Sequence, residues 1–169
     1  MSTLSVTALG AYDGVWRRAI LALKDGRRDV ATALGERLAS LVRARSILVP
    51  VPTTKKRRAQ RGFDGGDLLA RIAAAESGAT VIAGLRHLAG DAQRGRDRAA
   101  RLAARGRFGW AAESLAGRRI VLVDDVATTG STLEDCAATV RTAGGVVSEA
   151  IVVARAQPDA TTIERNTDA

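Results

Sequence analysis

The chain has 169 residues, which suits one domain with its own core and is short for two. No run of eighteen or more apolar residues occurs, and the amino terminus lacks a basic segment followed by an apolar one, so we expect neither a membrane-spanning helix nor a signal peptide. The single cysteine, Cys136, excludes an internal disulfide and a multi-cysteine zinc site, and these absences together favour a cytoplasmic protein.

The net charge of +8 favours anionic partners, such as phosphorylated metabolites or nucleic acid. Arginine outnumbers lysine 23 to 3, a bias that a GC-rich genome also produces, so the total charge alone decides little. Against this background the three lysines Lys24, Lys55 and Lys56 stand out, and two of them are adjacent.

The first half of the chain reads as helices followed by a strand and a basic loop. Apolar residues at helical spacing predict helices over about 14–26 and 29–44. The run SILVPVP at 46–52 predicts a buried strand, and the polar, basic stretch TTKKRRAQRGFDGG after it predicts a loop. A third helix is expected over 66–77, and a short strand over 79–85.

The second half contains the clearest strand, RRIVLVDDV at 118–126, followed by a helix over 131–145 and another apolar strand over 146–155. Before them, Arg86–Arg107 is rich in charge and alanine and suits either a helix or a flexible loop, and 108–117 holds a short strand and a turn.

Alternating strands and helices predict an α/β domain with a largely parallel sheet. We therefore expect a single domain over 1–169. It comprises a helical N-terminal segment over 1–45, a core over 46–155 and a frayed tail over 156–169.

The stretch VLVDDVATTGST at 121–132 places polar residues at the carboxyl end of a strand, where ligands bind in open α/β sheets. Asp124 and Asp125 supply acceptors that suit the vicinal hydroxyls of a sugar, or a magnesium ion with its waters. The following turn leads into a helix whose free N–H groups favour an anion, and Gly130 lets the backbone approach closely. Hydroxyl donors are added by Thr128, Thr129, Ser131 and Thr132. The stretch therefore predicts a site for ribose 5-phosphate.

Other phosphate-binding patterns are absent, because the chain has neither the G-K-S/T of a Walker A loop nor G-x-G-x-x-G. A strand–loop–helix turn with incidental capping residues would explain Ser131, but not two consecutive aspartates after an apolar strand.

The same stretch resembles the phosphoribosyl-pyrophosphate (PRPP) motif of type I phosphoribosyltransferases, in which two acidic residues precede T-T-G-S/G-T or a close variant. The resemblance implies a type I phosphoribosyltransferase-like α/β fold, with a mostly parallel sheet flanked by helices and a small N-terminal hood, to which Tyr12 and Trp16 could contribute. It implies that Asp124 and Asp125 contact the ribose hydroxyls, with magnesium bound indirectly beside PRPP, and that Ala127 to Thr132 wrap the 5-phosphate. Some purine-specific members have an aspartate at the position of Thr128, which argues against close kinship with them.

Together with this motif, YDGVWRRAILALKDGRR and ILVPVPTTKKRRAQRGFDGGDLLARIA resemble the ComF family of competence-associated phosphoribosyltransferase-like proteins, over roughly residues 11–155. The family pattern R-G-F-N is matched by Arg61 to Phe63, with Asp64 in place of asparagine, and later positions are matched by Gln93 and Arg101. Many members begin with a four-cysteine zinc segment, which this sequence lacks.

In type I phosphoribosyltransferases the loop after the first sheet strand holds pyrophosphate. The corresponding residues that we expect to bind substrate here are Thr53, Thr54, Lys55, Lys56 and Arg61. A solvated basic loop is the alternative, and a single strand of nucleic acid, stacked on Phe63, would suit these charges as well. The basic residues outnumber what one pyrophosphate needs, which leaves room for a second partner.

The segment Arg86–Arg107 is the candidate for a lid over the reacting centre, in which Gln93, Arg98 and Arg101 would reach the anion. An arginine-rich surface helix would explain its composition equally well. The one histidine, His87, is not expected to be catalytic.

Two functions follow. As an enzyme, the protein would transfer the phosphoribosyl group from PRPP to a nitrogen nucleophile and release pyrophosphate, although no general base is evident. As a non-catalytic ComF-type protein of DNA uptake or processing, it would bind single-stranded DNA or a competence partner through its basic surface. A homodimer is a further possibility that we predict.

Overall fold

A five-stranded sheet forms the centre of the protein in the computed structural model, which describes residues 4–88 and 107–156. The strand order is β1-β7-β6-β2-β3, and every neighbouring pair is parallel. The strands are β1 (Ser5–Ala11), β2 (Ile47–Pro50), β3 (Thr80–Val81), β6 (Arg119–Ala127) and β7 (Val146–Arg155). Their continuous apolar runs are typical of a parallel sheet that is covered on both faces.

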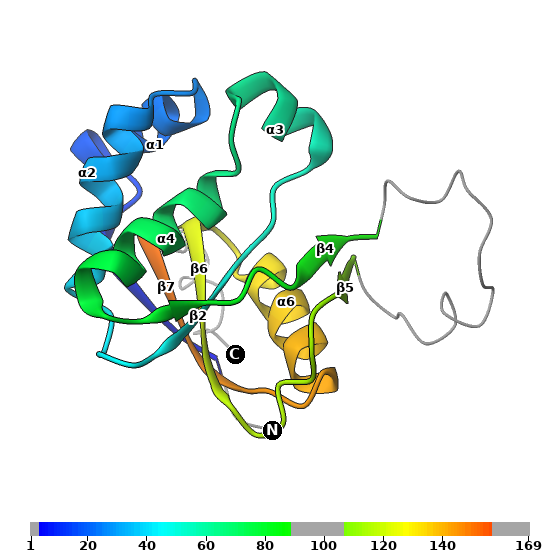
Figure 1. Ribbon diagram of the computed structural model, residues 1–169. Helices are drawn as coiled ribbons and strands as arrows, with labels where there is room; N and C mark the ends of the chain where they lie inside the picture. Colours follow the sequence, from blue (N-terminus) through cyan, green and yellow to red (C-terminus); the bar gives the residue numbers. More distant parts are fainter. Residues whose placement is uncertain (1–3, 89–106, 157–169) are drawn as a thin grey trace, which may run out of the picture.

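Helices cover both faces of this sheet (Figure 1). On one face lie α1 (Gly14–Lys24), α2 (Arg28–Ala39) and α4 (Gly65–Ser77), and on the other lies α6 (Ser131–Thr142). Successive side chains of β6 point to opposite faces of the sheet. Leu122 packs with α6, whereas Val123 packs with the layer formed by α1, α2 and α4. The α/β architecture that the sequence predicts, with a mostly parallel sheet flanked by helices, is confirmed.

The N-terminal segment contains a strand that the sequence analysis did not anticipate. β1 pairs in parallel with β7 at the sheet edge, with Ser5 opposite Glu149 and Ala11 opposite Arg155. The predicted helical segment 1–45 is therefore incomplete, since it begins with a strand before its two helices. The residues of β1 after Ser5 are half-buried, so they show no clear alternation of apolar and polar residues.

The basic stretch that we expected to be a loop contains the short helix α3 (Lys55–Arg61). The Thr54 hydroxyl caps it by accepting a hydrogen bond from the Arg57 backbone N–H at 3.3 Å, and Gly62 ends it in the left-handed conformation with φ 77°. Lys, Arg, Ala and Gln between these caps are good helix formers. The loop prediction was wrong because caps at both ends stabilise a helix of residues that are charged or polar but have good helix propensity.

The predicted strand over 79–85 is split between β3 and a second, two-stranded sheet. In that sheet β4 (Leu85–His87) pairs antiparallel with β5 (Phe108–Trp110). The lid candidates Gln93, Arg98 and Arg101 lie in the segment 89–106 between these strands, outside the described residues, so the lid stays a prediction. The tail from residue 157 onward is also outside them. Among the described residues, no helix combines the length and apolar character needed to cross a bilayer.

Candidate active site

A cleft of about 770 Å³ opens where β2 and β6 end, at the carboxyl edge of the sheet. It brings together the two stretches that the sequence analysis singled out. From the PRPP-like motif it is lined by Asp124, Asp125, Thr128 and Thr132, and from the basic stretch by Thr53, Thr54, Lys56 and Arg61. These stretches are about seventy residues apart in the chain and adjacent in the sheet, because β2 and β6 are paired neighbours.

The two aspartates form a concentrated negative site on the acidic side of the cleft. The Asp125 backbone N–H donates a hydrogen bond to Asp124 Oδ1 at 2.8 Å, which fixes the orientation of that carboxylate. Burial raises the pKa of Asp124 well above its usual value, and the charge of Asp125 raises it further, whereas Lys24 opposes the shift. A bound cation or a hydroxyl donor would therefore stabilise the ionised Asp124.

The turn after these aspartates has the form of an anion cradle. Gly130 has φ 79° and precedes the first residue of α6, so this left-handed position suits glycine. Thr129 Oγ1 donates to Ser131 Oγ at 3.1 Å and accepts from the Ser131 backbone N–H at 3.4 Å, which holds the turn together. Thr128 and Thr132 line the cleft, whereas Ala127 is buried and belongs to the core.

The basic side is anchored by an acidic residue, Asp64. Its Oδ2 accepts from the Thr53 backbone N–H at 3.0 Å, and its Oδ1 accepts from the Asp67 backbone N–H at 3.3 Å. Asp64 thus caps α4 and holds the loop between β2 and α3 in place. Lys55 is exposed and is not among the residues that line the cleft. Phe63 is only 7% exposed and lies beneath the Arg28 guanidinium at 5.3 Å, so its ring is covered rather than open for stacking.

Several lining residues were not predicted, because they come from separate elements. Lys24 lies at the end of α1 and lines the cleft. The one feature of the sequence that sets it apart is that it is one of only three lysines among 26 basic residues. From the base of the β4–β5 pair come His87, Arg107 and Phe108, and from α3 and α4 come Arg57, Gln60 and Gly66. Tyr12 and Trp16, expected in the hood, are not among the lining residues. No local pattern marks contacts of this kind.

The β4–β5 wall contacts both the loop after β2 and helix α6. The His87 Nε2 lies 3.0 Å from the carbonyl oxygen of Pro52, and the His87 and Phe108 ring centroids are 4.6 Å apart. Arg107 Nε donates to Asp135 Oδ2 on α6 at 2.8 Å. These contacts tie the second sheet to the loop after β2 and to α6, so the cleft has a third side besides its acidic and basic ones.

Cys136 is not part of this site. It is fully buried on α6, and burial raises the pKa of its thiol, so it stays protonated and is a packing residue as expected.

The comparisons with known proteins give a distant fold likeness only. No protein-family model matches the chain, and no curated protein is significantly similar to it. Similar solved structures include the AQ2163 protein from Aquifex aeolicus, with 12% identity, a TM-score of 0.44, and coverage of 90% of this chain and 88% of that one. The TT1426 protein from Thermus thermophilus has 20% identity, a TM-score of 0.41, and coverage of 80% and 85%.

A third similar structure is a purine phosphoribosyltransferase from Pyrococcus horikoshii, with 16% identity and a TM-score of 0.39 over 93% of this chain and 90% of that one.

Proposed function

We propose that this protein is a ComF-type phosphoribosyltransferase that binds PRPP or ribose 5-phosphate in the cleft. The observation that carries the proposal is that carboxylates and cations from separate elements line one cleft. Asp124 and Asp125 line it together with Lys56 and Arg61, and Thr128 and Thr132 line it from the turn at the strand end. A phosphorylated sugar that also bears a diphosphate has hydroxyls for the first side, a phosphate for the turn and a dense anion for the second.

The donor set suits magnesium shared with the ligand. Among residues 4–88 and 107–156, no group of three or more His, Cys, Asp or Glu side chains could hold a metal by itself. Two adjacent carboxylates supply hard oxygen ligands, and a bound cation would favour the ionised form of Asp124, whose pKa is raised in the cation's absence. Mg²⁺ commonly takes its remaining ligands from phosphates and water. When bound, the ion would neutralise charge on the diphosphate.

The chain's own groups would act mainly by positioning and by charge stabilisation. The aspartates would orient the ribose through its two hydroxyls, and the turn before α6 would hold the 5-phosphate. Lys56 and Arg61 would stabilise the departing pyrophosphate while a nitrogen nucleophile attacks the anomeric carbon of the ribose.

The test is a calorimetric titration of the full chain with PRPP, with and without magnesium. We expect saturable, magnesium-dependent binding that is lost in the Asp124→Asn/Asp125→Asn variant. The matched control is Glu36→Gln/Glu76→Gln, which removes two negative charges from exposed positions on α2 and α4 and should bind like wild type. Absence of PRPP binding in the folded wild type would refute the proposal.

Helix α3 favours a second candidate function, binding of single-stranded DNA by a non-catalytic ComF-type protein. The helix carries five basic residues in the sequence KKRRAQR, and none of its residues is buried. Such binding should weaken steeply as the salt concentration rises and should not require Asp124 or Asp125. A fluorescence anisotropy titration with a labelled oligonucleotide at several salt concentrations distinguishes it from PRPP binding.

A further inference from the structure

A second cleft, of about 450 Å³, lies beside the candidate active site and is separate from it. The two clefts share only Pro52 among their described lining residues. The charged residues that line the second cleft are Arg28, Arg58, Arg71, Arg86, Asp64 and Asp67. Its volume lies within the range of small-molecule sites, which is roughly 300–1,000 Å³.

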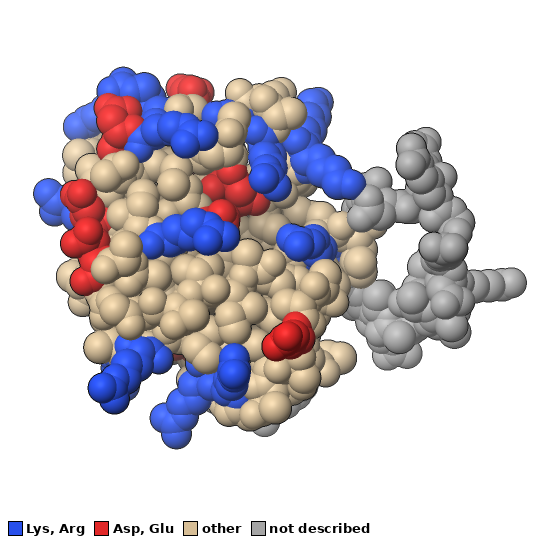
Figure 2. All heavy atoms as spheres, in the orientation of Figure 1, with Lys and Arg blue, Asp and Glu red and all other residues tan. Residues whose placement is uncertain are grey.

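In the part of the chain that the structure describes, the cleft is lined by four arginines and two aspartates. On the face of the molecule shown in Figure 2, Lys and Arg side chains are widely spread, with acidic side chains among them. Asp64 accepts two backbone N–H groups, and Asp67 Oδ2 accepts from Arg71 Nε at 2.8 Å, whereas the buried Asp67 Oδ1 has no hydrogen-bond partner among the described residues. Because the arginines that line the cleft outnumber these two aspartates, the cleft has more positive charge than its own carboxylates neutralise.

Two arginines carry this excess. Arg28 is occupied by the Phe63 ring and by the Gly62 carbonyl at 3.4 Å, and Arg71 is paired with Asp67. Arg58 and Arg86, by contrast, have no carboxylate partner among the residues that the structure describes, and both are exposed. They come from α3 and β4, so two independent elements place these guanidinium groups on one cleft.

Helix α3 divides its basic residues between the two clefts. Lys56, Arg57 and Arg61 line the candidate active site, whereas Arg58 lines the second cleft. This division accounts for the surplus of basic residues over what one pyrophosphate requires.

We infer that the second cleft is a binding site for a phosphorylated small molecule of nucleotide size, whose phosphate is held by Arg58 and Arg86. Arginine forks bind phosphate oxygens in pairs, which suits two guanidinium groups that line one cleft from separate elements. A stacked nucleic-acid base is disfavoured because Phe63, the one aromatic residue among the described residues that line this cleft, is already covered by Arg28. The inference does not depend on the proposed transfer reaction.

The test uses inorganic pyrophosphate as the probe, in calorimetric titrations of the full chain without magnesium. Wild type should show a site that survives in Lys56→Gln/Arg61→Gln, which weakens the candidate active site. That site should weaken about tenfold or more in Arg58→Gln/Arg86→Gln, because this variant removes the charge-assisted hydrogen bonds of both guanidinium groups to the phosphate.

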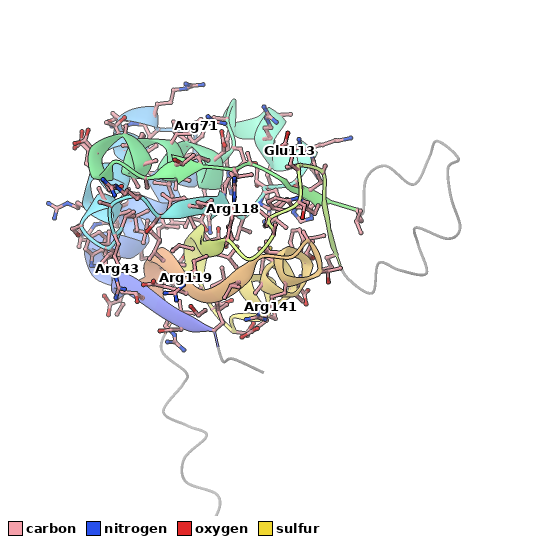
Figure 3. All side chains as sticks on the ribbon, turned by 60° about the horizontal axis from the view of Figure 1, so that its bottom comes forward. Arg43, Arg71, Glu113, Arg118, Arg119 and Arg141 are labelled. Carbon is pink, nitrogen blue, oxygen red and sulfur yellow. The ribbon has the colours of Figure 1, made fainter. Side chains whose placement is uncertain are left out.

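The matched control is Arg43→Gln/Arg119→Gln, which removes the same charge at exposed positions that lie well apart from Arg71 in Figure 3. If this control weakens pyrophosphate binding as much as Arg58→Gln/Arg86→Gln does, the effect is diffuse charge and the inference is wrong. It is also wrong if a single-stranded oligonucleotide, and not pyrophosphate, depends on Arg58 and Arg86. The titrations contain neither magnesium nor PRPP. They therefore test the second cleft even if the proposed transferase function is wrong.

Discussion

The acidic and basic sides of the candidate active site are built in opposite ways. The acidic side extends from β6, a central strand whose neighbours on both sides are paired and whose residues pack into two helical layers. The basic side is α3, a seven-residue helix with no buried residue, held by Thr54 at one end and Gly62 at the other. The acidic side is thus fixed by the core, whereas the basic side depends on local caps.

This contrast separates the roles that the two sides can play. A carboxylate pair held by the core is positioned before any ligand arrives, which suits orientation of a sugar. A short exposed helix is among the less stable parts of a fold, so its side chains can change position to fit an anion. Because its charges are in contact with solvent, their interaction with that anion weakens as the salt concentration rises. Three perturbations test the contrast, and they are ordered from the largest expected effect to the smallest.

The largest effect is expected at the junction between α4 and the strand ends. A Cβ atom at Gly66 would lie 2.5 Å from the carbonyl oxygen of Val51, which is backbone and has little freedom to move. We expect Gly66→Ala to destabilise the protein by about 1–3 kcal/mol and to weaken PRPP binding. Gly65→Ala is the control, since its Cβ would meet nothing closer than 3.7 Å. Urea unfolding measures both, and equal losses would contradict the packing argument.

A gain of stability is expected on the acidic side. Because the pKa of Asp124 is raised in the folded state, the folded protein binds more protons than the unfolded chain between the two pKa values, and its stability falls as the pH rises through that interval. Asp124→Asn should therefore be more stable than wild type at pH 7, and the difference should shrink as the pH approaches 4. Urea unfolding across this range measures the difference. A variant that is less stable at pH 7 would show that the carboxylate has a partner that compensates for its burial.

The smallest global effect is expected on the basic side. Thr54→Ala removes the cap of α3 and should cost the helix about 1 kcal/mol. Because no residue of α3 is buried, the midpoint of global unfolding should hardly move, whereas hydrogen exchange of the amides of residues 55–61 should accelerate roughly fivefold. Thr54→Ser keeps the capping oxygen and should exchange like wild type. A large fall in the melting temperature would mean that α3 is part of the cooperative core.

Contiguous features were predictable from the sequence. Asp124, Asp125 and the turn to Thr132 lie within one strand–turn–helix unit, so local pattern sufficed to place them on one edge of the sheet. The parallel sheet was predictable because β2, β6 and β7 are apolar runs of the kind that buried strands form.

The rest depends on tertiary contacts that no local pattern records. Lys24 reaches the cleft because α1 packs against α2 and β7, and His87 reaches it because its ring lies against Phe108 and the Pro52 carbonyl. Arg57 and Arg58 are adjacent in the sequence and line different clefts, because successive residues of a helix point in directions about 100° apart. If α3 is taken to be a loop, the sequence does not predict that its basic residues line two separate clefts.

Helix α3 is a wall common to both clefts, and thermodynamic linkage gives this a consequence. If a ligand in one cleft orders α3, the conformational entropy of the helix has already been lost when a ligand binds in the other cleft. The second ligand then binds more tightly, so the two bind cooperatively. Reciprocity then requires that the factor by which the first ligand improves the affinity of the second equals the factor measured in the opposite direction. Seven residues with no place in the core would in that case make two adjacent anion sites respond as one equilibrium.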